Sequence, residues 1–339
     1  MAYVIVAQKK GGPEVLQRVE LDLPEMSNLG PDEVLVRHTA VGVNFIDCYF
    51  RSGLYPWDKE KDLVLGSEAA GEIIAVGPSS DGQGSGFAVG DRVAYTIANG
   101  AYASHRVMTT KHLVKLPDGV ADEVAAASML KGLTAHYLLH KSFEVKRGQT
   151  VLFHAAAGGV GLIAGQWLKH KGVIAIGTAG GAEKCALAAK NGYDHVIDYT
   201  SEDFVARVKE ITGGAGVDVV YDSVGKDTYP GSLQCLKTFG TLVSFGQSSG
   251  PALDFKLSDI AAGSYTVTRP VLFHFTNSEG YLEAAAAELF AMLESGTIKV
   301  VINQSFQLDQ VADAHRALEG RKTTGSTVLT LSHSLESGG

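Results

Sequence analysis

The chain has 339 residues, 45% of them hydrophobic and 19% charged, which is typical of a globular protein with room for two domains. Its net charge of −8 argues against nucleic acid or an anionic membrane as the main partner, because phosphate groups bind to basic surfaces. The three cysteines, Cys48, Cys185 and Cys235, are far apart and odd in number, which argues against a disulfide framework and favours a cytoplasmic protein.

The first 124 residues consist of short apolar runs separated by glycine and proline. This pattern predicts a mostly β domain that forms a closed or partly closed barrel. A loop rich in glycine and serine is expected at residues 77–90. The predicted strands are 3–7, 16–20, 33–41, 70–76, 91–95 and 101–107.

Strands and helices alternate in the middle of the chain, after a predicted helix at 123–139 whose apolar stripe is broken at Lys131 and Gly132. The predicted strands are 150–154, 173–177, 195–198, 217–222 and 240–245, with helices at 161–171, 182–191, 202–211 and 228–237. Such alternation predicts a parallel sheet covered on both faces. The later elements are strand 264–268, helices 279–295 and 308–319, and a closing strand 326–331 that returns to the first domain.

A turn with almost no side-chain bulk joins the first strand of that sheet to its first helix. It fits the pattern G-x-G-x-x-G as Ala156-x-Gly158-x-x-Gly161, with the first glycine replaced. By itself the pattern also fits a turn that only packs a helix on a sheet. Its place after the first strand favours a dinucleotide site, where backbone N–H groups and the helix dipole face a pyrophosphate. The predicted contacts are Ala156, Ala157, Gly158, Gly159, Val160 and Gly161.

The end of the second strand indicates which nicotinamide cofactor binds. An NAD site usually has a carboxylate there for the ribose hydroxyl, whereas this chain has Thr178 followed by small residues such as Gly180, with Lys184 one helical turn later. A 2′-phosphate at this strand end would meet no carboxylate to repel it and would have the Lys184 cation nearby, which favours NADPH. Glu183 leaves the NADH alternative open, because a rotated helix would bring its carboxylate to the ribose. Ser223 and residues Phe245, Gly246, Gln247 and Ser248 follow later strands and are further predicted contacts.

Several segments together resemble the quinone oxidoreductase and zeta-crystallin branch of the zinc-independent medium-chain dehydrogenase/reductase superfamily. They are residues 44–47, 51–56, 131–135, 148–169, 221–225 and 245–246. The resemblance implies an α/β fold, with a GroES-like β-barrel catalytic domain at 1–126 and a Rossmann domain with a doubly wound parallel sheet at 127–272. Residues 273–339 would return to the catalytic domain. It also implies an NADPH-dependent quinone oxidoreductase and usually a homodimer.

Zinc-dependent relatives differ from this chain at two places. They have a cysteine where this chain has Asn44, and Gly-His-Glu where it has Gly66, Ser67 and Glu68. Without thiolate and imidazole at these positions a catalytic zinc lacks its usual ligands, so we expect no metal.

The resemblance also suggests roles for single residues. Asn44, Tyr49 and Thr134 would hold the cofactor, and Tyr55 and Lys131 would border the substrate. The resemblance implies a cleft between the two domains, where a hydroxyl or an ammonium group would polarise the acceptor oxygen. The candidate catalytic residues are therefore Tyr49, Tyr55 and Lys131. Lys184, Tyr199 and Arg321 would approach the phosphate end of NADPH, and Leu272 and Phe273 would offer backbone groups to the carboxamide.

Other interpretations remain beside this one. An NADPH-dependent alkenal or enone reductase would need a proton donor, for which Tyr55 or Lys131 would serve. A zeta-crystallin-like protein that binds AU-rich RNA is the non-enzymatic alternative, which the acidic net charge disfavours. His136 and His140 are spaced as metal ligands, but no third ligand lies near in sequence, so we expect structural histidines. The acceptor and the choice between one- and two-electron reduction are not determined by the sequence.

Overall fold

The chain forms two compact units in a computed structural model that describes residues 2–58, 61–80 and 86–331. The first unit comprises Met1–Leu130 and Ile302–Gly339, and the second comprises Lys131–Val301. Part of the predicted loop at 77–90, residues 81–85, lies outside the described residues. None of the helices in the described ranges has the length and apolar character that crossing a membrane requires.

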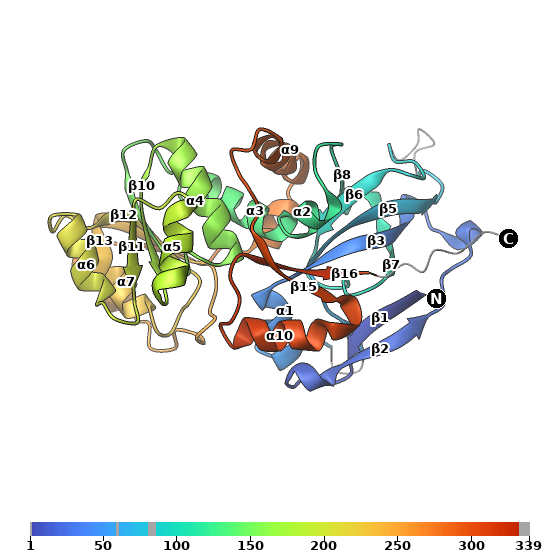
Figure 1. Cartoon of the computed structure of the whole chain (residues 1–339), viewed down its shortest axis with the longest axis horizontal. Coiled ribbons are helices and arrows are strands. Elements are labelled where there is room, and N and C mark those ends of the chain that lie inside the picture. The colour runs from blue at the N-terminus through green and yellow to red at the C-terminus, as the bar shows by residue number, and fades with distance from the viewer. Residues whose placement is uncertain (1, 59–60, 81–85, 332–339) are drawn as a thin grey trace. The chain divides into compact units, whose positions relative to one another are not determined.

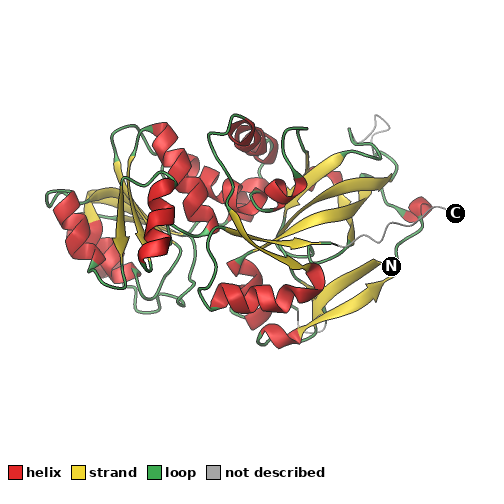
Figure 2. Cartoon of the chain, viewed as in Figure 1, coloured by secondary structure: helices red, strands yellow, loops and turns green. Residues whose placement is uncertain are grey.

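The first unit consists mainly of strands (Figure 2). Its strands are β1 (Ala2–Ala7), β2 (Leu16–Leu21), β3 (Glu33–Val43), β4 (Leu63–Val64), β5 (Glu68–Val76), β6 (Arg92–Thr96), β7 (His105–Thr109), β8 (Leu113–Lys115), β15 (Ile302–Gln307) and β16 (Ser326–Thr330). Its helical segments are η1 (Pro13–Val15), η2 (Met26–Asn28), α1 (Phe45–Ser52), η3 (Thr110–His112), α2 (Asp122–Ala126), η6 (Leu308–Gln310) and α10 (Val311–Glu319).

Strand β3 organises the first unit. Over the described residues it pairs with β5, β7 and β16 in the sheet ordered β15-β16-β3-β5-β6-β8, and a smaller sheet is ordered β2-β1-β4. Val34 and Val36 of β3 are fully buried, together with Ile73 and Tyr95 from neighbouring strands. Because β16 comes from the C-terminal part of the chain and pairs with β3, the first unit contains strands from both the N-terminal and the C-terminal parts of the sequence.

The second unit contains a parallel sheet. Its strands are β9 (Thr150–Phe153), β10 (Ile174–Ala179), β11 (His195–Asp198), β12 (Val217–Asp222), β13 (Leu236–Ser244) and β14 (Thr266–Thr268). Its helical segments are α3 (Met129–Tyr137), η4 (Leu138–Ser142), α4 (Gly159–Lys171), α5 (Ala182–Lys190), α6 (Phe204–Ile211), α7 (Tyr229–Cys235), η5 (Leu257–Gly263), α8 (Leu272–Thr276) and α9 (Tyr281–Glu294).

The strand order of this sheet, among the described residues, is β11-β10-β9-β12-β13-β14, with parallel pairing throughout. Figure 1 shows α4 and α5 on one face of the sheet and α6 and α7 on the other. The order reverses between β9 and β12, and ligands of doubly wound sheets bind at such a reversal, beyond the carboxyl ends of the strands. The predicted α/β fold class is therefore confirmed.

The structure corrects the predicted helix 123–139. Helix α2 ends at Ala126 and α3 begins at Met129, so two helices lie where one was predicted. Lys131 and Gly132, where the apolar stripe is interrupted, lie within α3. The Ser128 hydroxyl donates to the carbonyl of Val124, a local bond that competes with helix continuation. Gly132 lies inside α3, and a Cβ atom there would come within 2.6 Å of Leu289 on α9. Sequence analysis also missed α1, α8, β4, β8 and β15.

Candidate functional site

The small-residue turn of the second unit begins where β9 ends. The N–H of His154 donates to the carbonyl of Tyr221 on β12 (3.0 Å), and that of Ala156 donates to the carbonyl of Thr178 on β10 (2.9 Å). The chain therefore crosses between the two strands that flank β9 before α4 starts. Ala155, between them, adopts a left-handed conformation with φ 55°, which is uncommon for a residue other than glycine.

Helix α4 starts close to this backbone. Gly158 is its N-cap residue, and the N–H of Gly158 donates to the carbonyl of Ala155 at 3.0 Å. A Cβ atom on Gly161 would lie 2.5 Å from the carbonyl oxygen of Ala155 and 2.7 Å from that of Ala156. The turn can therefore be this tight only with glycine at 161. Because the first N–H groups of a helix have no intrahelical acceptor, the turn presents donors to an anion.

The loops after β12 and β13 meet beside this turn. The N–H of Ser248 donates to the carbonyl of Ser223 at 3.1 Å, and a Cβ atom on Gly246 would lie 2.6 Å from that same carbonyl. The ring of Phe245 lies 5.7 Å from that of Phe153 on β9. Ser223, Phe245, Gly246 and Ser248 thus gather at the carboxyl edge of the sheet, as sequence analysis expects for residues after parallel strands.

A buried polar network supports the turn from inside the unit. Asp222 accepts hydrogen bonds from the N–H groups of Val224 and Gly225 and from the hydroxyl of Ser232 (2.8 Å). Ser232 has one proton, so His154 Nε2 must donate to its oxygen at 3.0 Å. His154 Nδ1 then accepts from the Thr178 hydroxyl at 2.9 Å. Burial lowers the pKa of His154, in agreement with a neutral ring.

The residues expected near the ribose phosphate lie at the ends of β10 and β11. Thr178 is buried, and its hydroxyl faces His154. A Cβ atom on Gly180 would lie 2.6 Å from the Tyr199 hydroxyl, so these two residues are neighbours. Lys184 is half-buried in the first turns of α5. Sequence analysis missed Asp198, whose Oδ1 accepts from the N–H of Gly181 at 2.9 Å.

Helix α3 carries two further predicted residues. Lys131 and Thr134 are both buried, with 5% and 6% of their surfaces exposed, and they are three positions apart and so on the same helix face. Leu272 and Phe273 begin the short helix α8, whose Phe275 ring stacks on Tyr137 of α3 at 4.7 Å.

In the first unit the predicted residues surround α1. Asn44 is its N-cap residue, and Gly53, with φ 83°, ends it. The Tyr49 and Tyr55 rings meet edge to face at 5.3 Å, and the N–H of Tyr55 donates to the Tyr49 carbonyl at 3.0 Å. Arg321 is exposed in the segment after α10, with φ 56°.

The two places where zinc-dependent relatives differ from this chain, Asn44 and residues 66–68, are joined by a hydrogen bond. Asn44 Nδ2 donates to Glu68 Oε1 at 2.9 Å, and Glu68 Oε2 accepts from the N–H of Leu130 at 2.6 Å. The Ser67 hydroxyl donates to Asp47 Oδ1 at 2.7 Å. The donor set here is an amide, a hydroxyl and carboxylates, which are not the soft ligands that zinc prefers. Glu68, although fully buried, was not among the predicted site residues.

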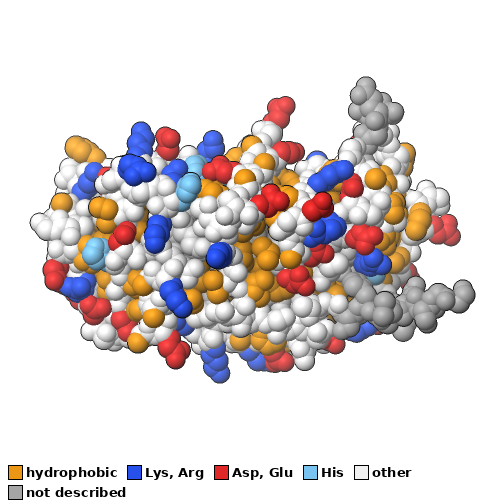
Figure 3. Space-filling view, turned by 45° about the horizontal axis from the view of Figure 1, so that its top comes forward, with side chains coloured by type: hydrophobic (Ala, Val, Ile, Leu, Met, Phe, Trp, Pro, Cys, Tyr) orange, Lys and Arg blue, Asp and Glu red, His pale blue; other side chains and the backbone are white. Residues whose placement is uncertain are grey.

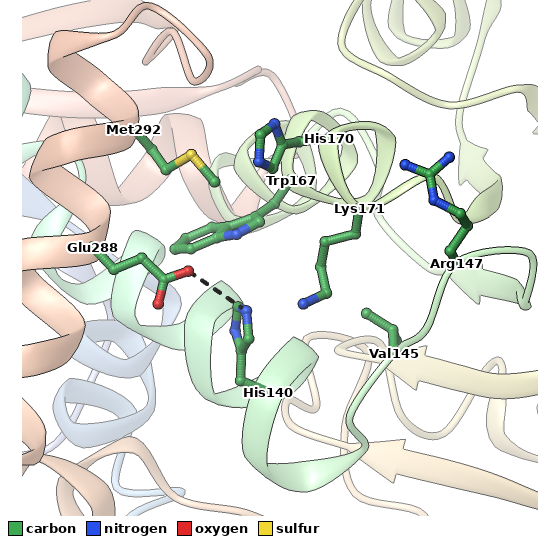
Figure 4. Close-up of a pocket in the computed structure, with 8 residues that line it drawn as sticks. All are labelled: His140, Val145, Arg147, Trp167, His170, Lys171, Glu288 and Met292. Atoms are coloured by element: carbon green, nitrogen blue, oxygen red, sulfur yellow. Dashed lines mark ion pairs between the residues drawn. The ribbon is translucent and has the colours of Figure 1, made fainter.

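A cavity of about 350 Å³ lies elsewhere in the second unit. Its lining residues, drawn in Figure 4, are His140, Val145, Arg147, Trp167, His170, Lys171, Glu288 and Met292, and none of them is a predicted site residue. Glu288 also pairs with His136 Nε2 at 3.1 Å, while His136 Nδ1 lies 2.8 Å from the Tyr281 hydroxyl. Among the described residues no group of three or more His, Cys, Asp or Glu side chains could hold a metal ion. His136 and His140 both have hydrogen-bond partners.

Charged side chains of both signs are interspersed on the molecular face shown in Figure 3, rather than segregated into one basic area.

Comparison with known proteins identifies the family. The profile of the alcohol dehydrogenase GroES-like domain matches residues 30–118, and that of a zinc-binding dehydrogenase matches residues 191–329. A quinone oxidoreductase of Pseudomonas aeruginosa is 50% identical over 321 residues, which cover 94% of this chain and 96% of that protein. The chain belongs to the quinone oxidoreductase family. The positions of the missing zinc ligands, 44 and 66–68, lie outside the zinc-binding dehydrogenase match.

The names of two further relatives of this chain mention a cofactor or a reaction. The structure of Escherichia coli quinone oxidoreductase complexed with NADPH superposes with a TM-score of 0.92 at 46% identity, over 97% of this chain and 99% of that one. A 2-haloacrylate reductase of a Burkholderia species is 41% identical over 338 residues, covering 97% of this chain and 99% of that protein.

Proposed function

We propose that this protein is an NADPH-dependent, zinc-independent oxidoreductase that passes reducing equivalents from NADPH to quinones. The observation that carries the proposal is the similarity to quinone oxidoreductases over nearly the whole length of the chain. The side-chain-poor turn at the start of α4 supports it. A quinone is already electrophilic, so the protein needs mainly to bind and orient two ring systems.

The residues of the second unit fit NADPH. The backbone leaves no room for a side chain at Gly161, and the first N–H groups of α4, which have no acceptor within the helix, suit a pyrophosphate. Lys184 and Tyr199 lie by Gly180 at the end where a 2′-phosphate is expected, and Ser223 and residues 245–248 line the same sheet edge. Bound NADPH supplies the reducing equivalents through its nicotinamide ring.

Roles for the remaining residues rest on the family resemblance. We assign Asn44, Tyr49, Thr134, Leu272, Phe273 and Arg321 to cofactor binding, and Tyr55 and Lys131 to the acceptor. A buried ammonium at Lys131 would stabilise negative charge on the acceptor oxygen more strongly than it would in water, because the surroundings are less polar.

The test is a titration with NADPH and with NADH, followed by a screen of acceptors with and without a chelator. We expect tighter binding of NADPH, turnover with quinones, and no loss of activity on metal removal. Failure to bind either nicotinamide would remove the proposal, and full inactivation by the chelator with recovery on zinc addition would remove its metal-free part.

The 41% identity to 2-haloacrylate reductase favours a second candidate, the reduction of an activated carbon–carbon double bond. That reaction needs a proton for the adjacent carbon, and Tyr55 or Lys131 would donate it. Steady-state kinetics with a quinone and with an enone separate the two candidates. If the enone has the higher kcat/KM, the alkene reductase is correct.

We also propose a cytoplasmic homodimer. The location is supported by three free cysteines, Cys48, Cys185 and Cys235, and the dimer by the family resemblance. Light scattering during size-exclusion chromatography measures the mass of the assembly, and a monomeric mass would contradict the dimer.

A further inference from the structure

A chain of buried polar groups joins α10 to the start of α1 within the first unit. His315 of α10 lies 3.0 Å from Arg51 (Nδ1 to Nη1) and 2.9 Å from the Tyr102 hydroxyl (Nε2 to Oη). Tyr102 in turn donates to Asp47 Oδ2 at 2.8 Å. These four side chains are at most 2% exposed, although all of them are ionisable groups that would be solvated at a surface.

The proton positions along this chain follow from the number of donors. The Asp47 carboxylate accepts from Tyr102, from Ser67 and from the backbone N–H of Asn44. Tyr102 has only one hydroxyl proton, so its oxygen must accept from His315 Nε2–H. His315 Nδ1 then has a lone pair and accepts from the Arg51 guanidinium, which cannot itself accept. The hydrogen bonds from Arg51 to His315, from His315 to Tyr102 and from Tyr102 to Asp47 therefore all run in one direction, toward Asp47. Burial, together with Arg51, lowers the pKa of His315 to about 3.

The chain of hydrogen bonds ends at Asn44. Asp47 is the third residue of α1 and binds the N–H of Asn44 at 2.8 Å, which fixes the backbone at the helix start. Glu68 fixes the side-chain amide of the same residue at 2.9 Å. Buried ionic networks rarely stabilise a fold better than apolar packing does, so a role in fixing one geometry is the more informative interpretation here.

We propose that His315 and Tyr102 are positioning residues for the reaction, which act through Asp47 to hold Asn44 in the orientation that binds the cofactor. This inference rests on the proposed function, in which Asn44 contacts NADPH. Neither His315 nor Tyr102 needs to touch the cofactor, and neither was found by sequence analysis, because they lie 213 residues apart in the chain.

The first test is Tyr102→Phe, which removes one hydroxyl and keeps the ring. We expect the dissociation constant for NADPH, measured by fluorescence titration, to rise about tenfold, since a hydrogen bond to a charged group is lost. The matched control is Tyr95→Phe. Tyr95 is also fully buried in this unit, and its hydroxyl contacts His38 Nε2 (2.9 Å) and Arg106 Nη1 (3.4 Å), neither of which lies on α1. The control should lower the melting temperature and leave NADPH affinity unchanged.

The second test is a double-mutant cycle with Asn44→Ala. If Tyr102 acts through Asn44, Tyr102→Phe adds little further loss of affinity once the Asn44 side chain is gone. Additive losses, or an unchanged affinity in Tyr102→Phe alone, would overturn the inference. If Asn44→Ala itself binds NADPH normally, the assignment of Asn44 under the proposed function fails instead, so the two failures are distinguishable.

Variants of His315 extend the test. His315→Gln keeps an N–H that can reach Tyr102, whereas His315→Leu keeps bulk and loses both hydrogen bonds. We expect the glutamine variant to retain more NADPH affinity than the leucine variant, with both carrying the wild-type secondary structure by circular dichroism. Equal affinities in two folded variants would contradict the proposal.

Discussion

At the scale of single residues, the proposed preference for NADPH over NADH rests on the end of β10. The strand ends without an acidic side chain, and Gly180 and Tyr199 are in contact there. Asp198, the nearby carboxylate, accepts hydrogen bonds from the N–H of Gly181 and from Thr200. The hydrogen bonds from Thr200 and Gly181 lower the pKa of Asp198, so its carboxylate is ionised, and its acceptor Oδ1 is already used by groups of the loop. Lys184 is the half-buried cation on the adjoining helix α5.

Replacing Lys184 with alanine tests this assignment. We expect Lys184→Ala to weaken NADPH binding by roughly tenfold and to leave NADH binding nearly unchanged, since only NADPH has the 2′-phosphate. The dissociation constants are measured by fluorescence titration. Lys190→Ala, in the last turn of the same helix, is the control and should change neither. Equal losses for both nicotinamides in Lys184→Ala would remove the assignment.

At the scale of elements, the connection from β9 to α4 is tight enough to exclude a side chain at position 161. The left-handed Ala155 brings its carbonyl under the first turn of α4, where only glycine fits at position 161. A network of hydrogen bonds also stabilises this connection, running from Thr178 through His154 and Ser232 to Asp222. It links β10, the end of β9, α7 and β12.

A methyl group at Gly161 should disrupt this connection. Alanine gains up to about 1 kcal/mol in helix propensity, but a Cβ atom 2.5 Å from a backbone oxygen costs about 1–3 kcal/mol in displaced structure. We therefore expect Gly161→Ala to lower both the free energy of unfolding and the affinity for NADPH. Gly158→Ala, where the closest contact is 3.2 Å, should be milder in both assays. The reverse ranking would contradict the steric explanation.

At the scale of the whole molecule, buried neutral histidines make stability dependent on pH. Burial lowers the pKa of His154, and burial together with Arg51 lowers that of His315 to about 3, against an ordinary value of 6.5. Below pH 6.5 these two histidines bind protons in the unfolded chain but stay neutral in the folded protein. The free energy of unfolding must therefore fall as the pH falls, by up to about 1.4 kcal/mol per pH unit for each histidine.

Denaturant unfolding at pH 7.5, 6.5 and 5.5 measures this dependence. We expect a small loss of stability between the first two values, as the histidines of the unfolded chain begin to take up protons, and a larger loss between the second and the third. His315→Leu should show a shallower loss, because one of the titrating groups is absent. The carboxylates with lowered pKa, Asp91 and Asp198, titrate below 3.8 and do not contribute in this window. Stability that stayed constant or rose toward pH 5.5 would contradict the expectation.

The sequence by itself determined the fold class, the family and the composition of the nucleotide turn, because apolar periodicity and glycine spacing are local properties of the chain. It also placed Ser223 and Phe245 at one sheet edge, since both follow parallel strands. The predicted domain boundaries and site residues remain predictions.

The tertiary structure alone decided which polar groups meet. Tyr102 and His315 are separated by 213 residues and His154 and Ser232 by 78, so no local pattern relates them. Helix α1 was missed because it is one short amphipathic segment whose buried face, including Asp47 and Arg51, is polar. A polar side chain is stable in a core only where folding supplies its partners, and those partners come from distant parts of the chain.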